Sequence, residues 1–410
     1  MAELEKALAV QAPGQGVADE PPKSLARRKR KPPLFVDQAA MKSLRLVAVA
    51  YSHVRREWFP TEEAYQAEIE VEERAREVVE ALAQLDIKAR LYRADRYFMS
   101  KLLVDQPDLV LNLVDTLRGK DGLQTSIPGA LELANIPYTG ARMRGLVIGN
   151  DRNLMKELLD ANDIPTPPFQ FVSRRGRRIQ EDLGLPLIVK LNESGGSVGI
   201  DDAAVKESYK EAEKRANELI RTYKMPVIVE RFIHGPELTV VVFDDGVRVS
   251  AFCAEKVFNY TSHPKYRFTS FESYSHPDAY SYKKADKAIE DRVNRLARKA
   301  FKVLWCRDYA KFDVRVDEVD GTPYFTDANP NTAFGPDLGL PFTEVLQLHE
   351  IDFSTVLASL MSKYARTLLD TAHRGPRKHA PAAKSSPSPL HTQPAPSPGL
   401  QSDPPALPDQ

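Results

Sequence analysis

Two aspartates and an asparagine near the end of the chain have a spacing that suits cation binding. Asp313 lies in a run of alternating side-chain type, and Asp327 and Asn329 lie in a second run beyond the turn Asp320-Gly321. Such alternation is typical of a half-buried strand, and Asp-Gly is a frequent hairpin turn. A hairpin would bring the three side chains together, and their oxygens would suit Mg²⁺ that is also bound by water and phosphate oxygens.

The same residues have a simpler interpretation. Asp-Gly hairpins are common, and acidic side chains on strands usually face solvent. Asn329-Pro330 can also be nothing more than the end of a strand. The hairpin alone does not distinguish a cation site from an ordinary surface hairpin. The distinction depends on the other elements of the chain.

Composition restricts the class of protein. The chain has 410 residues, and its 57 Lys and Arg equal its 57 Asp and Glu, so the net charge gives no reason to expect nucleic acid or an anionic membrane as partner. The two cysteines, Cys253 and Cys306, exclude a disulfide framework and fit a reducing compartment. No apolar run approaches the roughly 18 residues of a membrane span, and the N-terminus does not resemble a secretory signal. We therefore expect a cytoplasmic protein.

Alternating elements predict the first folded unit. Residues 44–50 and 109–114 are apolar and predict buried strands, and a long acidic helix is predicted from about Thr61. Strand, helix and strand in this order indicate a parallel α/β layer, with ligands bound at the carboxyl ends of the strands. Residues 1–43, with a basic run at 27–31, and the Pro- and Ser-rich residues 371–410 are predicted to be disordered tails.

A strand that ends in Lys190 leads into a glycine-rich loop with Ser194, Gly195, Gly196 and Ser197. Backbone N–H groups of such a loop can approach phosphate oxygens, and the lysine would add a positive charge. The spacing is not that of a Walker A loop. A glycine turn between two antiparallel strands is the alternative.

Two glutamates follow in the next pair of predicted strands. Glu230 lies near the end of one strand, and Glu237 follows Gly235-Pro236. One carboxylate could accept from the amino group of adenine while the other holds ribose hydroxyls. The alternative is a pair of solvated glutamates at a hinge.

Taken in this order, the elements resemble the ATP-grasp fold, and most closely the D-alanine–D-alanine ligase family. The resemblance covers residues 44–365 and implies an N-terminal parallel α/β preATP-grasp domain and two α+β subdomains that clasp ATP. The residues that carry it are Gly119 to Gln124 with Ala130 to Gly140, Leu187 to Lys190 with Gly195 to Gly199, Val229-Glu230 with Gly235 to Val240, and Phe312 to Val314 with Asp327 to Pro330. The implied domains are 44–145 for the first unit, 146–237 for the central subdomain, and 238–370 for the C-terminal subdomain with the metal-binding hairpin.

The resemblance also implies a role for each matching residue. ATP would be bound by Arg152, Lys156, Lys190, Ser194, Gly195, Glu230, Ile233 and Glu237. The catalytic residues would be Lys311, Gly196 and Ser197, and Asp313, Asp327 and Asn329 would ligate two Mg²⁺ ions, or Mn²⁺ in their place. Asp121 belongs to the implied amino-acid side, Arg55 and Arg56 are candidate anchors for a substrate carboxylate, and a homodimer is implied.

Departures from the family pattern lie on the amino-acid side. The first loop, 49–56, is basic and lacks the acidic residue that orients the first D-alanine in the ligases, and Lys311 replaces an arginine. The sequence therefore predicts an ATP-dependent carboxylate–amine ligase, a carbon–nitrogen ligase of the acid–amino-acid class, acting through an acyl phosphate on small amino-acid or peptide substrates that differ from those of the family. A true D-alanine–D-alanine ligase and a non-catalytic ATP-binding scaffold or regulatory protein are the alternatives.

Overall fold

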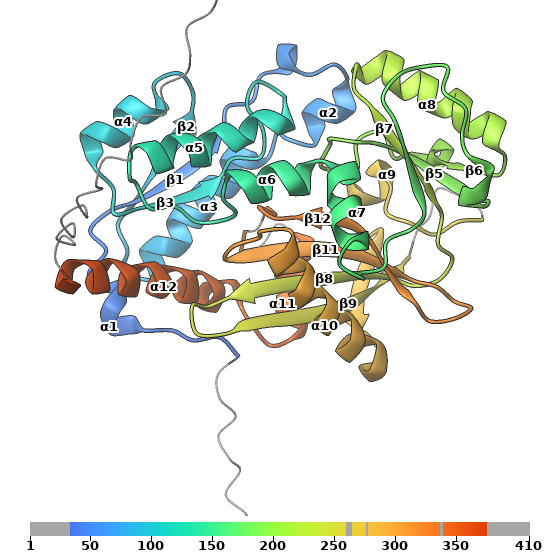
Figure 1. Cartoon of the computed structure of the whole chain (residues 1–410). Coiled ribbons are helices and arrows are strands. Elements are labelled where there is room, and N and C mark those ends of the chain that lie inside the picture. The colour runs from blue at the N-terminus through green and yellow to red at the C-terminus, as the bar shows by residue number, and fades with distance from the viewer. Residues whose placement is uncertain (1–32, 260–264, 276–277, 334, 337–338, 375–410) are drawn as a thin grey trace, which may run out of the picture.

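The computed structural model describes residues 33–259, 265–275, 278–333, 335–336 and 339–374. Within these residues the strands form three sheets, and helices pack on them (Figure 1). The helices are α1 Gln38–Met41, α2 Glu62–Gln66, α3 Val71–Gln84, α4 Phe98–Asp105, α5 Ser126–Leu133, α6 Met143–Asn150, α7 Arg152–Asp160, α8 Tyr209–Tyr223, α9 Phe271–Ser275, α10 Lys287–Val303, α11 Pro341–Leu348 and α12 Phe353–Arg374, with 3-10 helices η1 Arg56–Trp58, η2 Asp121–Thr125, η3 Glu181–Leu183 and η4 Asp202–Ala204. The strands are β1 Val47–Ser52, β2 Ala89–Ala94, β3 Leu109–Leu113, β4 Phe169–Val172, β5 Leu187–Leu191, β6 Val205–Lys206, β7 Val227–Arg231, β8 Glu237–Asp244, β9 Val249–Phe258, β10 Tyr280–Lys284, β11 Tyr309–Val316 and β12 Pro323–Asn329.

The first sheet is parallel, which confirms the α/β prediction. Its strand order is β2-β1-β3, and Val47 pairs with both Ala89 and Leu109. All residues of β1 and β3 are buried, as expected for a parallel sheet with both faces covered. The Ser52 hydroxyl at the end of β1 accepts the backbone N–H of Asp115 at 3.0 Å. This bond fixes the loop after β3 at the carboxyl ends of the strands.

The second sheet is antiparallel, with strand order β4-β7-β5-β6, and carries α8 on one face (Figure 1). Ser208 begins α8 by accepting the backbone N–H of Glu211, and the helix buries Ala212, Ala216 and Leu219 on one stripe. β5 and β7 are direct neighbours in this sheet. Lys190 and Glu230 therefore lie on adjacent strands.

The third sheet has the order β10-β9-β8-β11-β12 and contains the predicted hairpin. β11 pairs with β12 on one side and with β8 on the other. Its apolar face, including Val240, Phe312 and Phe325, joins a core that also contains Val293 and Ala297 of α10. The hairpin is thus held by β8 beside β11 and by the α10 core beneath it, with β12 at the edge of the sheet.

The acidic helix predicted from Thr61 is divided in two. Thr61 begins α2 by accepting the backbone N–H of Ala64, but α2 ends at Gln66 and α3 starts only at Val71. In the turn between them, Thr116 Oγ1 donates to Glu68 Oε2 at 3.1 Å. The prediction of one helix is wrong because this long-range contact is invisible to local periodicity.

Residues 33–43 do not belong to a tail, although the sequence boundary at residue 43 placed them there. Leu34 is 1% exposed and packs in the core that contains α12, and α1 lies beside α12 (Figure 1). The Ser359 hydroxyl donates to the carbonyl of Phe35 at 2.8 Å. Composition could not reveal this because a few apolar residues, rather than the average of the segment, make the contact.

We expect Leu34→Ala to lower the free energy of unfolding by about 2–4 kcal/mol, because a fully buried side chain leaves a cavity. Urea unfolding would measure the change. Leu133→Ala is the matched control, since Leu133 is 91% exposed. Equal stability of the two variants would show that residues 33–43 do not contribute to the core.

Some of the sequence predictions concern residues that the structure does not describe. The basic run at 27–31 and the residues of the predicted tails at 1–32 and 375–410 lie outside the described ranges. Among the described helices, none combines the length and apolar character that crossing a membrane requires. The cytoplasmic location therefore stays a prediction.

Candidate active site

A cavity of about 240 Å³ is lined by the second and third sheets and by loops that follow the first sheet. It gathers most of the predicted site residues, although they are spread over more than 200 positions of the sequence. Those that line it are Asp121, Arg152, Lys190, Ser194, Gly195, Gly196, Ser197, Glu230, Ile233, Glu237, Lys311, Asp313, Asp327 and Asn329. Their roles stay predictions, but their convergence in one cavity is a finding.

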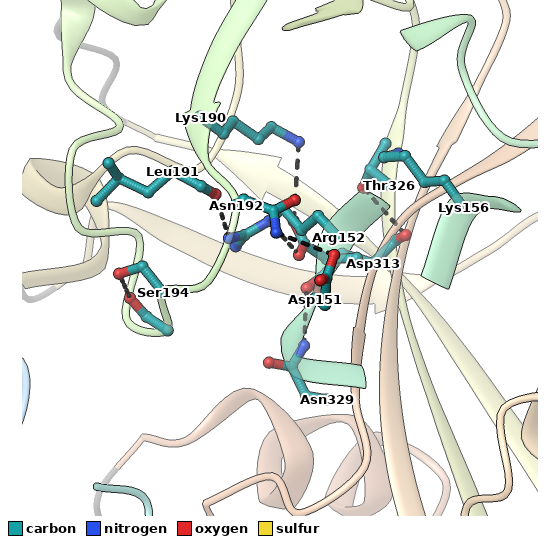
Figure 2. A network of polar contacts seen from close by, with 12 residues as sticks. Asp151, Arg152, Lys156, Lys190, Leu191, Asn192, Ser194, Asp313, Thr326 and Asn329 are labelled. Carbon is teal, nitrogen blue, oxygen red and sulfur yellow. Dashed lines mark hydrogen bonds and ion pairs between the residues drawn. The ribbon is translucent and has the colours of Figure 1, made fainter. Parts of the chain in front are cut away.

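The hairpin brings its polar residues to one face. Asp313 pairs directly with Asp327, and Lys311 pairs with Asn329. Lys311 Nζ lies 2.5 Å from Asp313 Oδ2, and Asn329 Nδ2 lies 3.5 Å from the same oxygen. Because side chains two residues apart on a strand share a face, all four residues converge on the cavity. Figure 2 shows Asn329 pointing toward Asp313.

Arg152 connects α7 to the hairpin. Asp151 begins α7 by accepting the backbone N–H of Leu154, which leaves Arg152 in the first turn. Arg152 Nε donates to Asp327 Oδ1 at 2.8 Å, and Lys190 Nζ lies 3.7 Å from Asp327 Oδ2. Burial alone would raise the pKa of Asp327, but the positive charges of Arg152 and Lys190 lower it. The carboxylate is thus kept ionised.

Glu230 lies between two ammonium groups. Its Oε2 is 3.2 Å from Lys156 Nζ and its Oε1 is 3.4 Å from Lys190 Nζ. Both Lys156 and Glu230 are 0% exposed. Burial lowers the pKa of Lys156 to about 8, although the charge of Glu230 acts in the opposite direction. Lys156 does not line the cavity; it lies behind the wall and supports Glu230 from there.

Glu237 lies in a second buried network. Lys256 Nζ is 3.0 Å from Glu237 Oε1, and Arg315 Nη1 donates to Glu237 Oε2 at 2.9 Å. Arg315 Nε also donates to the carbonyl of Ile233 at 2.7 Å. Burial alone would raise the pKa of Glu237, but Lys256 and Arg315 lower it to about 2. The network fixes the chain from Ile233 to Glu237 along the cavity wall.

This pKa predicts how stability depends on pH. The pKa of Glu237 is lower in the folded chain than in the unfolded one, so its contribution is present above about pH 4.5 and is lost as pH falls toward 2. We expect Glu237→Gln to be less stable than the wild type by about 3 kcal/mol at pH 7. The difference should narrow between pH 4.5 and pH 3 in urea unfolding. A constant difference would contradict the assignment, and Glu157→Gln, at an exposed glutamate, is the control.

The glycine-rich loop lies close to the first unit. The backbone N–H of Gly195 donates to Asp121 Oδ2 at 2.8 Å. Gly196 has φ +58, and a Cβ at this position would lie 2.8 Å from the Cβ of Ala67. Only glycine combines this conformation with so close an approach. Burial raises the pKa of Asp121 to about 6, although the N–H of Gly195 lowers it.

Arg55 and Arg56 are not among the cavity-lining residues of the described chain. Arg55 pairs with Glu57 at 3.4 Å and Arg56 with Glu62 at 2.7 Å, and all four side chains are largely exposed. The structure thus separates these two candidate anchors from the other site residues. A run of basic residues after a strand does not indicate where their side chains point.

Three residues that sequence reasoning missed line the cavity instead: Glu68, Arg74 and Asp115. Asp115 follows β3, so the rule that ligands bind at the carboxyl ends of parallel strands could have found it. Glu68 and Arg74 reach the cavity only because a turn divides α2 from α3. No pattern in the sequence indicated that turn.

The hairpin offers a donor set for a hard cation. In the described residues there is no cluster of three or more His, Cys, Asp or Glu that could hold a metal by itself. Asp313 and Asp327 provide two carboxylates and Asn329 an amide oxygen on one face. Such a set fits Mg²⁺ that takes its remaining ligands from water and phosphate oxygens.

Comparison with known proteins identifies the family. A family model described as "D-ala D-ala ligase C-terminus" matches residues 158–362. The chain is 30% identical over 219 residues to the D-alanine–D-alanine ligase of Paracidovorax citrulli, which covers 52% of this chain and 63% of that protein. The ligase of Nitrosomonas europaea is 31% identical over 219 residues, covering 52% of this chain and 67% of the relative. The first alignment thus spans less than two thirds of the relative.

Solved structures show the same fold. D-alanine–D-alanine ligase from Bacillus anthracis, complexed with ATP, aligns with a TM-score of 0.61 and 20% identity over 80% of this chain and 99% of that one. VanG D-Ala:D-Ser ligase from Enterococcus faecalis aligns with a TM-score of 0.56 and 18% identity over 78% and 99%. The predicted ATP-grasp fold is therefore confirmed, and the chain belongs to the D-alanine–D-alanine ligase family.

Proposed function

We propose that the protein is an ATP-dependent carboxylate–amine ligase that forms an amide bond through an acyl phosphate. The observation that carries the proposal is the convergence of Arg152, Lys190 and Lys311 with Asp313 and Asp327 in one cavity. Cations beside a carboxylate pair are what the transfer of a phosphoryl group requires. The names of the relatives support the same reaction class.

The wall near Glu230 and Glu237 suits the nucleoside part of ATP. Ile188, Ile200 and Phe268 line it and belong to one apolar cluster, which offers a flat purine ring an apolar surface. In our proposal the backbone at Ile233 borders the ring, Glu237 binds ribose, and Glu230 acts on the base or keeps Lys190 in place. Both oxygens of Glu230 already have ammonium partners, which favours the second role for it.

Lys190, Arg152 and the Ser194 to Ser197 loop would bind the phosphates. In the loop, the N–H groups are the donors, and the conformation of Gly196 allows a close approach. Two Mg²⁺ ions, or Mn²⁺, held by Asp313, Asp327 and Asn329, would supply positive charge beside the phosphate oxygens. Lys311, which now neutralises Asp313, could turn to the transferred phosphoryl group.

The reaction balances without a further reactant. An oxygen of the substrate carboxylate attacks the γ-phosphorus of ATP, the bond to the β–γ bridging oxygen breaks, and ADP leaves. The neutral amine of the second substrate attacks the acyl carbon, phosphate leaves with the electrons of the C–O bond, and the nitrogen gives up a proton to the leaving phosphate or to solvent. The protein contributes mainly position, charge and exclusion of water.

The decisive experiment measures phosphate release from ATP and Mg²⁺ with single and paired D- and L-amino acids and short peptides. Release that requires one particular pair would support the ligase and identify its substrates. D-Alanine alone as the required partner would favour a true D-alanine–D-alanine ligase. ATP binding without release under any pair would favour a nucleotide-binding scaffold. Analytical ultracentrifugation would test the homodimer that the family resemblance implies.

A further inference from the structure

One wall of the cavity is strongly acidic. It contains Glu68 from the turn between α2 and α3, Asp115 after β3, and Asp121 at the start of η2, and we call these three residues the acidic wall. The guanidinium of Arg74, 7% exposed, faces them, with Nη2 3.5 Å from Asp115 Oδ2. Even with Arg152 also near Asp121, this side of the substrate space carries more acidic than basic side chains.

The carboxylates of the acidic wall are close enough to repel one another. Burial raises the pKa of Glu68 well above its usual value, and the charges of Asp115 and Asp121 raise it further. Burial also raises the pKa of Asp115, against the effect of Arg74. Carboxylates held together at such a cost are typical of a binding or catalytic site. A bound cation would relieve the repulsion.

A second feature of this wall points to a ligand independently. Gln124 is 7% exposed and lines the same cavity, and among the described residues no side chain or backbone group is found hydrogen-bonded to its carboxamide, which reaches the cavity surface. Gln124 follows Asp121 by three positions in η2, and side chains three apart in a 3-10 helix are eclipsed. A buried amide without a partner is costly unless a ligand or water satisfies it. Asp121 and Gln124 thus face the cavity together.

The acidic wall lies next to the residues that would bind the phosphates in the proposed reaction. Asp121 accepts from Gly195 of the glycine-rich loop, and the charge of Arg152 is near enough to lower the pKa of Asp121. Arg152 in turn binds Asp327 of the hairpin. A molecule whose carboxylate lies among the cations of the phosphate end can therefore extend its other groups toward the acidic wall.

The arrangement of the acidic wall suits an organic cation better than a metal ion. In the described part of the chain no three His, Cys, Asp or Glu are grouped closely enough to hold a metal, so the acidic wall does not form a single coordination site. Carboxylates spread along a wall instead suit ammonium groups separated by a short carbon chain. A neutral amino acid offers one ammonium group, which leaves part of the negative charge without a partner.

We propose that the carboxylate substrate of this ligase is a diamino acid, with both of its ammonium groups bound at Glu68, Asp115 and Asp121. The inference rests on the proposed ligase function and specifies its substrate class. Gln124 accepts or donates a further hydrogen bond to the same molecule. Arg74 holds Asp115 in place, so that the wall keeps its shape before the substrate binds.

The test compares two molecules of nearly equal size. In 2,4-diaminobutyrate an ammonium group occupies the place of the terminal methyl group of norvaline. Phosphate release is measured with ATP and Mg²⁺ for the D- and L-forms of each, with alanine as reference and a panel of amines as acceptors. We expect the KM for diaminobutyrate to be at least tenfold lower than that for norvaline. A preference for norvaline or alanine with normal turnover would overturn the diamino acid and leave the ligase intact.

Substitutions in the acidic wall distinguish a loss of diaminobutyrate binding from a general loss of activity. Glu68→Gln should raise the KM for diaminobutyrate about tenfold, with a much smaller effect on norvaline and on kcat. Glu70→Gln is the control, because Glu70 is exposed two positions away. Equal effects of Glu68→Gln on both amino acids would contradict the proposal.

Calorimetry with ADP and Mg²⁺ present gives a readout that does not depend on turnover. Tighter binding of diaminobutyrate than of norvaline, lost in Glu68→Gln, would support the cation site even if no phosphate were released. Absence of release with every substrate pair would count against the ligase function. Equal calorimetric affinities for the two amino acids would overturn the acidic wall as a cation site.

Discussion

Asp327→Asn combined with Asn329→Ala should reduce Mg²⁺-dependent phosphate release by about 10³-fold or more. The two substitutions remove one of the two carboxylates and the amide oxygen that share a face of the hairpin. The fold should survive, because the side chains involved point into the cavity and the core of the third sheet is unchanged. Turnover assays and circular dichroism would measure the two effects.

A binding measurement makes this prediction independent of turnover. Mn²⁺ binding in the presence of ADP, followed by electron paramagnetic resonance, should weaken in the double variant. Glu318→Gln, at an exposed position of the same hairpin, should leave both turnover and Mn²⁺ binding unchanged. Unchanged turnover in the double variant would show that the hairpin does not hold the metal.

Glu230→Gln should lower the free energy of unfolding by about 3–5 kcal/mol, because it leaves buried ammonium groups without their carboxylate. Glutamine keeps the shape of the side chain, so a new cavity does not explain a loss. Lys156 is 0% exposed and cannot turn to solvent. Urea unfolding at pH 7 would measure the effect.

A second substitution tests the cause. Lys156→Met in the Glu230→Gln background should recover part of the lost stability. The substitution removes the buried ammonium group that has lost its carboxylate partner, whereas Lys190 remains at the cavity edge. Additive losses in the double variant would contradict an ion pair. Stability of Glu230→Gln within about 0.5 kcal/mol of the wild type would show that Glu230 does not stabilise the fold.

The amino-acid sequence by itself determined the elements with strong local patterns. The alternation around Asp313, the turn at Asp320-Gly321 and the return to Asp327 predicted a hairpin whose polar residues share a face, and the structure confirms it. The order of strand and helix likewise predicted the parallel first sheet. These features depend on periods of two residues or on turns, which are local properties of the chain.

Tertiary structure decided the arrangement around these elements. Leu34 and the chain beside it pack on α12, more than 300 positions away, which the composition of the segment could not show. Lys156 and Lys190 meet at Glu230 because α7, which packs in the core of the third sheet, extends Lys156 to β7 of the second sheet, and no spacing in the sequence implies that pair. Burial, not sequence position, gives these charges their importance.

On the substrate side of the cavity, too, local sequence pattern and tertiary contacts determine different features. The basic residues after the first strand suggest Arg55 and Arg56 as substrate anchors, yet both pair with glutamates outside the cavity. Glu68 faces the cavity because a hydrogen bond from Thr116 holds the turn between two helices. Local pattern thus fixed which strands and helices form, whereas long-range contacts, which no local pattern encodes, decided which charged side chains face the substrate.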